Sequence, residues 1–349
     1  INDKHSLNLT AMYPQNSRGK SSQNTEEVNN LMGIKYNSYW GWQDGKKRNS
    51  RDKDVEEPLV MLSHYWKLSD KTSLNTNVAF QTGTIGNSRL DFQLGNNPDP
   101  TYYKNLSSYF SNLGGYTQGQ LTQIDDTFRA NSQIDWNAMY IANQNSAFPG
   151  RSVYVLYEDR SDDTQLSVNT ILNSEVSEHV TLNAAVNYKR LKSHNFAEII
   201  DMLGSTTGYL NVDSFDQVQF DLLNPNQIVG EGDTFRYNYN LEANIISMFA
   251  QAQFNYNKVD FFIAVSNTRT SYQRDGLYQS EVYLDNSLGK GEKVEFSGIV
   301  ENIGAQNQTD AVFTATTGSY TGTSAATPHV SAAAALILSL GNYTNEEVN

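Results

Sequence analysis

The segment Leu59–Gln81 has the sequence LVMLSHYWKLSDKTSLNTNVAFQ, and its pattern decides the fold class. Every second residue from Leu74 to Phe80 is Leu, Thr, Val or Phe, whereas the residues between them are Asn, Asn and Ala. The first half of the segment alternates in the same way and is interrupted by His64. Such alternation places apolar side chains on one face of a β-strand, and the polar stretch Ser69–Thr72 predicts a tight turn. The segment is therefore predicted to be a β-hairpin.

The same pattern recurs along the chain. Alternating segments lie at 166–172, 180–188, 235–245, 250–256 and 259–265. Short polar turns are predicted near Ser174–Glu178 and at Asn257–Lys258. Long polar stretches rich in Gly, Asn, Asp, Ser and Tyr, at 82–160, 191–233 and 267–292, predict long loops. Short turns at one end of the strands and long loops at the other are typical of an outer-membrane β-barrel.

A soluble β-sandwich with one solvated face would show the same alternation. Two features favour the barrel. The polar face consists mostly of uncharged Asn, Ser, Thr and Gln, as in a barrel lumen, and loops this long are uncommon in compact soluble domains. The predicted fold is mainly β: a partial antiparallel transmembrane β-barrel of about eight to twelve strands with long loops, followed by a short C-terminal Ala-rich helix.

Composition narrows the function classes. The net charge of -13 and the pI near 4.8 argue against a nucleic-acid partner, which would require a basic surface. The chain has no cysteine, which excludes a disulfide framework and Cys-based zinc sites. No apolar run of about 18 residues occurs, which excludes a transmembrane helix but not a membrane barrel.

Several strand and loop motifs resemble a known family of barrels. They are 36–51 with Glu57–Pro58, 86–91, 97–103, 155–160 and 235–240. Together they resemble the barrel of TonB-dependent outer-membrane receptors of the Bacteroidetes type over about residues 1–304. This resemblance implies an outer-membrane location and import of a scarce small-molecule or glycan ligand. It also implies contact with outer-membrane lipid and energy from the TonB system, acting through a plug domain that this chain does not contain.

Aromatic residues in the predicted loops and strand ends are candidates for stacking on a ligand. They are Trp40, Trp42, Tyr102, Tyr103 and Trp136. An interfacial belt or loop packing explains such residues more often. The acidic pairs Asp125–Asp126 and Asp162–Asp163 could hold Ca²⁺, but isolated pairs are more often solvated. We therefore expect no metal site and no cofactor.

A different signal begins near residue 305. The segment Gly322–Val330, GTSAATPHV, is followed by the Ala-rich run Ser331–Leu338. It resembles the segment around the active serine of subtilisin-like serine peptidases, which implies that Ser324 is the nucleophile at the start of a buried helix. A helix N-terminus stabilises developing negative charge. A further helix is predicted from the capping box of Thr344 and Glu347.

The remainder of a serine-peptidase triad is not recognisable. Such a peptidase needs a His base oriented by an Asp. The five histidines are His5, His64, His179, His194 and His329. None is followed by Gly, and neither Asp-Ser-Gly nor Asp-Thr-Gly occurs. The chain is therefore predicted to be inactive as a peptidase in the form given.

Two domains are predicted, a receptor barrel at 1–304 and a peptidase segment at 305–349. The start at Ile1 and the end at Asn349 lead us to expect a fragment. The favoured interpretation is a barrel fragment joined to a non-functional peptidase segment. The first alternative is a secreted subtilisin-like endopeptidase with an inserted or accessory β-rich binding domain, and the second is a soluble glycan-binding β module.

Overall fold

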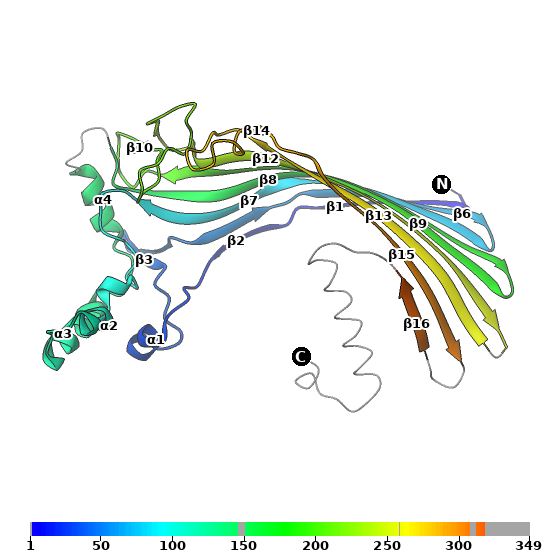
Figure 1. Ribbon diagram of the computed structural model, residues 1–349, viewed down its shortest axis with the longest axis horizontal. Coiled ribbons are helices and arrows are strands. Elements are labelled where there is room, and N and C mark those ends of the chain that lie inside the picture. Colours follow the sequence, from blue (N-terminus) through cyan, green and yellow to red (C-terminus); the bar gives the residue numbers. More distant parts are fainter. Residues whose placement is uncertain (1, 146–150, 258, 308–311, 318–349) are drawn as a thin grey trace.

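The computed structural model describes residues 2–145, 151–257, 259–307 and 312–317. Its main feature is one 12-stranded antiparallel sheet (Figure 1). The strands along its main path are β1 (His5–Met12), β6 (Leu59–Ser69), β7 (Thr72–Phe92), β8 (Tyr154–Ser177), β9 (Val180–Asp201), β12 (Thr234–Tyr256), β13 (Val259–Gly276), β15 (Val294–Asn307) and β16 (Val312–Thr317). The strands β2 (Gln15–Gly19), β5 (Asp52–Glu56) and β14 (Gly289–Lys290) pair beside this path.

The smaller elements belong to the loops. They are β3 (Trp40–Gln43), β4 (Lys46–Asn49), β10 (Tyr209–Leu210), β11 (Ile228–Val229), α1 (Glu26–Met32), a 3₁₀ turn (Tyr103–Asn105), α2 (Ser107–Leu113), α3 (Gln118–Ala130) and α4 (Trp136–Gln144). Among the described residues, no helix is both long enough and apolar enough to cross a membrane.

The predicted asymmetry of turns and loops is confirmed. Two residues separate β6 from β7, β8 from β9 and β12 from β13, all at one end of the sheet. At the other end lie the helices and the loops 93–153, 202–233 and 277–293 (Figure 1). The sheet is open: its path begins at β1 and ends at β16, so the described strands form a partial barrel wall.

The strands extend further than predicted. Residues 82–92, 154–160, 191–201 and 267–276 were expected in loops but lie in strands. They lack apolar alternation because they carry charges that pair across strands. Arg160 on β8, for example, contacts Glu198 on β9 at 2.9 Å. Backbone pairing between strands is satisfied without an apolar face, so a polar sequence can continue a strand.

The strand register separates two faces of the sheet near the short turns. Leu62 pairs with Val78 and Val78 with Val168, and these residues define what we term the apolar face. Leu62 and Val78 are 45% and 39% exposed, respectively. On the opposite, asparagine face, Asn77 pairs with Asn169 and Asn169 with Asn187. These three amides are hydrogen-bonded to one another, as predicted for a polar lumen wall.

The apolar residues of the alternating segment 235–245 do not lie on the apolar face. Leu241 pairs with Ser193 and Ile245 with Lys189, so these residues lie on the asparagine face rather than with Val168. The long loop 202–233 accounts for the apolar residue at the start of this segment, Phe235. It covers this part of the asparagine face and buries Phe235 completely against residues such as Val229, which makes an apolar residue favourable there.

Small cores form where loops meet the sheet. One lies under loop 202–233 and consists of Val155, Tyr157, Ala197, Ile199, Met202, Tyr209, Val229 and Phe235. A second lies under α4 and consists of Ile134, Trp136, Met139, Val153, Tyr154, Leu156 and Leu203. The loop end of the sheet is thus held by packing on both faces, whereas the turn end presents its apolar face uncovered.

Candidate functional site

One candidate ligand site is a cleft of about 550 Å³ among the loops. Its lining combines one tryptophan with many short polar residues. It is lined by Trp42, Asn96, Asn97, Pro98, Asp99, Pro100, Asn105, Ala130, Asn131, Ser132, Gln133, Ile134, Asp135, Ala138, Met139 and Tyr154. An aromatic ring surrounded by amides and carboxylates suits a neutral ligand with many hydroxyl groups.

The hairpin of β3 and β4 positions Trp42. Its two-residue turn has Asp44 and Gly45 at φ 49° and 75°, the conformation of a type I′ turn. Gly41 allows the hairpin to approach the backbone of Ile134, where a Cβ atom would collide with the carbonyl oxygen. Trp42 itself is 56% exposed, and its ring is available to the cleft.

The loop after β7 forms the opposite wall and holds itself in shape. Asp99 Oδ1 accepts hydrogen bonds from the Thr101 amide and hydroxyl at 2.9 and 2.8 Å. Asn97 Oδ1 accepts one from the Asp99 amide at 3.0 Å. Asp135 caps α4 by accepting from the Ala138 amide at 2.9 Å. These local bonds make the wall preorganised, which favours binding.

The predicted aromatic residues differ in their positions. Trp40 meets Trp42 edge-on at 5.8 Å, with the Lys47 ammonium 4.2 Å from the Trp40 ring centre. Tyr102 and Tyr103 meet edge-on at 4.7 Å beside the cleft wall, and Tyr103 is 54% exposed. These four residues therefore lie in or next to the loops that form the cleft.

Trp136 is different because it lies in the core under α4. It is fully buried, and its Nε1 donates to the Arg48 carbonyl at 3.3 Å. The Arg48 guanidinium covers the ring at 4.3 Å and pairs with Asp201 at 2.6 Å. The ring therefore has no free face for a ligand, and Trp136 supports the cleft from behind.

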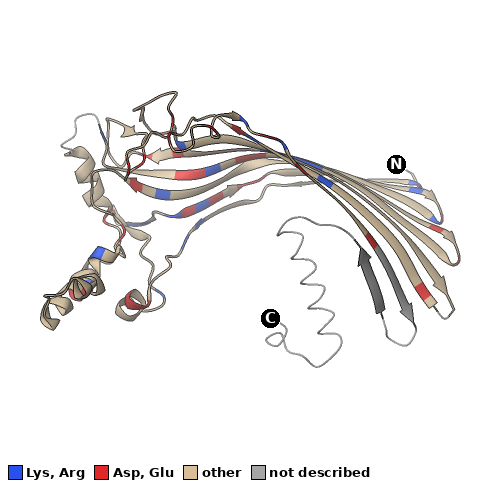
Figure 2. Ribbon diagram, viewed as in Figure 1, with Lys and Arg blue, Asp and Glu red and all other residues tan. Residues whose placement is uncertain are grey.

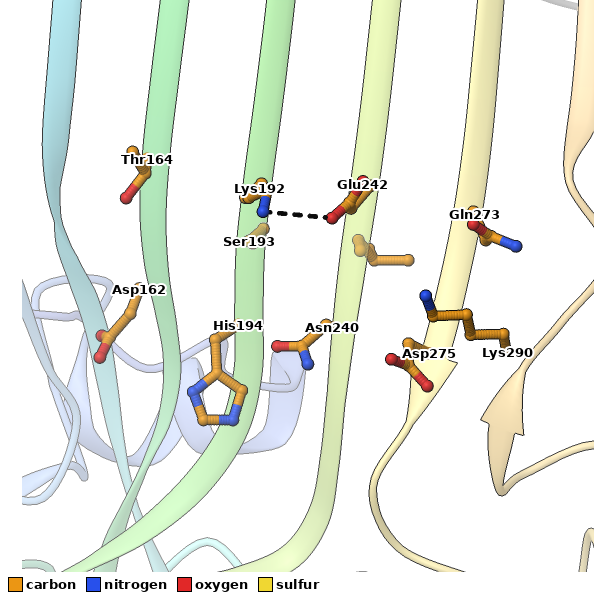
Figure 3. A pocket seen from close by; sticks show the side chains of 11 residues that line it. Asp162, Thr164, Lys192, Ser193, His194, Asn240, Glu242, Gln273, Asp275 and Lys290 are labelled. Atoms are coloured by element: carbon orange, nitrogen blue, oxygen red, sulfur yellow. Dashed lines mark ion pairs between the residues drawn. The ribbon is translucent and has the colours of Figure 1, made fainter.

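A second pocket, of about 340 Å³, lies across the strands (Figure 3). Figure 3 shows Asp162, Lys192, Glu242 and Gln273 on four neighbouring strands, with Lys290 nearby. Lys192 Nζ and Glu242 lie 3.5 Å apart. The pocket contains both positively and negatively charged side chains. Its ion pairs are half-exposed, and each such pair contributes little to stability.

A buried polar cluster fixes loop 202–233 to the sheet. Asp91 accepts hydrogen bonds from the Tyr209 hydroxyl at 3.2 Å and from the Ser214 hydroxyl at 2.9 and 3.0 Å. Arg236 Nη1 lies 3.6 Å from Asp91 Oδ1. We term these four residues the Asp91 latch. Because Asp91 is in phase with Asn77 along β7, the latch lies on the asparagine face.

Burial determines the electrostatics of the latch. It raises the pKa of Asp91, with the Arg236 cation and the two hydroxyl donors acting in the opposite direction. Burial also raises the pKa of Tyr209 well above its usual value. Beside the latch, Asp159 pairs with Arg89 at 2.8 Å and accepts a hydrogen bond from the Tyr237 hydroxyl at 3.0 Å. No motif in the sequence indicates this cluster, because its members come from separate segments of the chain.

One member of each acidic pair considered for Ca²⁺ forms an ion pair with an arginine instead. Asp126 pairs with Arg129, and Asp162 with Arg160, both at 2.8 Å. In the described parts of the chain, no group of three or more His, Cys, Asp or Glu side chains converges to hold a metal ion.

Ser324, His329 and the predicted C-terminal helices lie outside the described residues. The other histidines are described, and their ring nitrogens contact a second imidazole, a backbone carbonyl or an amide oxygen. The predicted boundary at 304/305 falls inside β15, whose residues Ala305–Asn307 still pair with β13.

Comparison with known proteins supports the resemblance of the C-terminal segment. The model of the subtilase family matches residues 263–349, about a quarter of the chain. This confirms the resemblance of the C-terminal segment. The match begins in β13, so its described part consists of antiparallel strands of the sheet. No curated protein matches the sequence.

Several solved outer-membrane structures are similar to this chain. The outer membrane transporter YddB from Escherichia coli has 6% identity and a TM-score of 0.40, over 91% of this chain and 31% of that one. The open form of the ferric-catecholate import receptor Fiu from E. coli K12 has 10% sequence identity and a TM-score of 0.42. The similarity covers 88% of this chain and 42% of that receptor. A Pseudomonas aeruginosa FadL homologue has 12% sequence identity and a TM-score of 0.32. The similarity covers 91% of this chain and 57% of that homologue.

The chain thus spans 31 to 57% of the length of these three proteins. The TM-scores are below 0.5, so these similarities do not extend to function. The fold is defined instead by the strand order, register and loop asymmetry of the described residues.

Proposed function

We propose that residues 1–304 form part of the wall and outer loops of an outer-membrane transporter that imports a scarce nutrient, either a small molecule or a glycan. One observation carries this proposal: on strands joined by short turns, an exposed apolar face backs onto a hydrogen-bonded asparagine face. In water, exposed apolar area is unfavourable by about 25 cal/mol per Å². In a bilayer the same face is favourable and the polar face lines a lumen.

The dimensions agree with this role. β6 has 11 residues, and a tilted strand needs about 9–11 residues to cross the hydrocarbon core. Charged residues gather toward the loop end of the strands and at the turns, while the intervening sheet is mostly uncharged (Figure 2). In this arrangement the outer loops hold the ligand in the cleft beside Trp42. Import draws its energy from the TonB system, which acts through a plug domain outside this chain.

Site-directed spin labelling tests the orientation directly. This chain has no cysteine, so single cysteines at Leu62 and Val78 can be compared with those at Ser63 and Asn77. In bilayers containing the protein that carries this chain, we expect oxygen to reach the first pair and a water-soluble nickel chelate to reach the second. Access should therefore alternate with a period of two residues. Equal access of the nickel chelate to both faces would contradict the membrane wall and favour the soluble β module.

A second candidate function follows from the subtilase match at 263–349. In that case the chain belongs to a secreted serine endopeptidase, with Ser324 as nucleophile and the β-rich region as an inserted binding domain. We favour a join of two unrelated segments after about residue 305, because no Pro- or Gly-rich linker separates the receptor-like part of the sequence from the active-serine segment.

Tryptic mass spectrometry on the natural source separates these two interpretations. Lys293 is the last Lys or Arg, so cleavage after it gives one peptide, Val294–Asn349, that carries both signals. We expect instead peptides that continue the barrel past Gly304 and a different flank before Gly322. Recovery of the intact Val294–Asn349 peptide would show one polypeptide and favour the peptidase.

A further inference from the structure

Basic side chains gather on the asparagine face near the loop end of the sheet. Arg18 on β2 lies directly opposite Lys53 on β5, and Lys53 lies opposite Asn87 on β7. Residues that face each other across antiparallel strands project from the same face. Asn87 and Arg89 are in phase with Asn77 along β7, so these cations share the asparagine face.

Two further cations, Lys20 and Arg51, lie beside them. Lys20 follows β2, and its Nζ donates to Asn87 Oδ1 at 2.6 Å. Burial lowers the pKa of Lys20, and the nearby positive charges of Arg89, Arg51 and Lys53 lower it further. We term this group the basic patch, and its members are Arg18, Lys20, Arg51, Lys53 and Arg89.

The basic patch has few negative partners. Arg89 pairs with Asp159 at 2.8 Å, but across the described residues the other four cations form no ion pair. Acidic residues outnumber basic ones by 38 to 25 in this chain, so composition does not explain the group. Like charges directly opposite each other, such as Arg18 and Lys53, destabilise a sheet. An anion bound between them would remove this repulsion.

We propose that the basic patch binds the imported ligand, and that this ligand is an anion with at least two carboxylate or phosphate groups. The inference rests on the proposed function, because the asparagine face borders a lumen only in a transporter. Arg18 and Arg51 can each present a planar fork of N–H donors to such a group. Four cations without a carboxylate exceed what one singly charged group can neutralise, which favours a polyanion. A surface of one sign also concentrates solutes of the opposite charge.

Calorimetric titration of the detergent-solubilised protein that carries this chain tests the proposal. The probes are sodium pyrophosphate and the tricarboxylate tricarballylate. At low ionic strength we expect saturable binding of at least one of them, weakened by added salt. The tighter of the two distinguishes a phosphate from a carboxylate ligand. Lys20→Gln and Lys53→Gln should each weaken this binding about tenfold, the effect of losing one hydrogen bond to a charged group.

Lys53→Glu separates a ligand site from a structural cluster. The glutamate would face Arg18 in the register, so the ligand-free variant should unfold at a higher temperature than the parent. Saturable binding of the anions should be lost at the same time. A purely structural role for Lys53 would instead lower the unfolding temperature, and that result would contradict the proposal.

The matched control is Lys192→Gln. It removes the same charge from the opposite face, since Lys192 is out of phase with Asn187 along β9, and its affinity should equal that of the parent. The proposal would be overturned if neither anion bound saturably, or if Lys192→Gln weakened binding as much as Lys53→Gln. Alternating access of spin labels at Leu62 and Ser63 without anion binding would refute the anionic ligand and leave the membrane wall intact.

Discussion

Replacing Trp136 with alanine should open the loop layer that supports the cleft. The side chain is fully buried under α4, and a Trp→Ala change in a core destabilises by about 3–5 kcal/mol. The same ring also supports Arg48, so its loss would loosen the β3–β4 hairpin. The sheet has its own backbone pairing, and the opening should therefore remain local. Hydrogen exchange of the α4 amides should accelerate strongly, with little change in β8 and β9.

The matched control is Trp42→Ala. Trp42 is half-exposed in the cleft, so its removal should change α4 exchange by less than about a factor of ten, as for other surface substitutions. It should instead weaken binding of the imported ligand. If Trp42→Ala and Trp136→Ala accelerated α4 exchange equally, the assignment of Trp42 to the cleft and of Trp136 to the core would be wrong.

These two tryptophans also show where the sequence is informative. Composition cannot distinguish a buried from an exposed tryptophan, because both occur in polar stretches. Burial of Trp136 depends on Asp135 starting α4 and on Arg48, which is 88 residues away. A readable signal for one of the helices is the capping box of Thr117 and Gln120 at the start of α3. It was hidden in a stretch predicted to be a loop.

The turn end of the sheet was predictable because one physical rule governs it. The apolar face must alternate with the asparagine face, and the register of Leu62, Val78 and Val168 follows from that alternation. At the loop end the rule fails, since loops cover both faces of the sheet. Phe235 is buried on the asparagine face there, and Arg236 lies in a bulge with φ 65° that interrupts the alternation.

Replacing Asp91 with alanine should detach loop 202–233 from the sheet. The change leaves the buried hydroxyl of Tyr209 and the half-buried hydroxyl of Ser214 without their acceptor, and Arg236 without its carboxylate. Lost partners of this kind destabilise by about 1–3 kcal/mol for a buried hydroxyl and more for a fully buried ion pair. Because the Arg236 side chain is 32% exposed, about 2–3 kcal/mol in total is expected. Hydrogen exchange of the loop amides, including that of Asn211, measures this loss of stability.

The latch should also respond to pH, and the sign follows from burial. The pKa of Asp91 is raised in the folded loop, so the folded state keeps a proton that the open loop has lost. As the pH rises from the ordinary range of an aspartate through the raised pKa, the latched state should become less stable. Below the ordinary range the effect should vanish, since both states are then protonated. Protection factors corrected for the intrinsic exchange rate should show this change.

Asp91→Asn isolates the proton from the hydrogen bonds. Its amide oxygen still accepts from Tyr209 or Ser214 but cannot ionise, so most protection should remain and its pH dependence should be lost. The control is Asp159→Asn on the neighbouring strand. Asp159 contacts Arg89 and Tyr237 instead of loop 202–233, so loop protection should stay as in the parent. If Asp91→Asn kept the pH dependence, or if Asp159→Asn weakened the loop as much as Asp91→Ala, a carboxylate other than Asp91 would hold the loop in place.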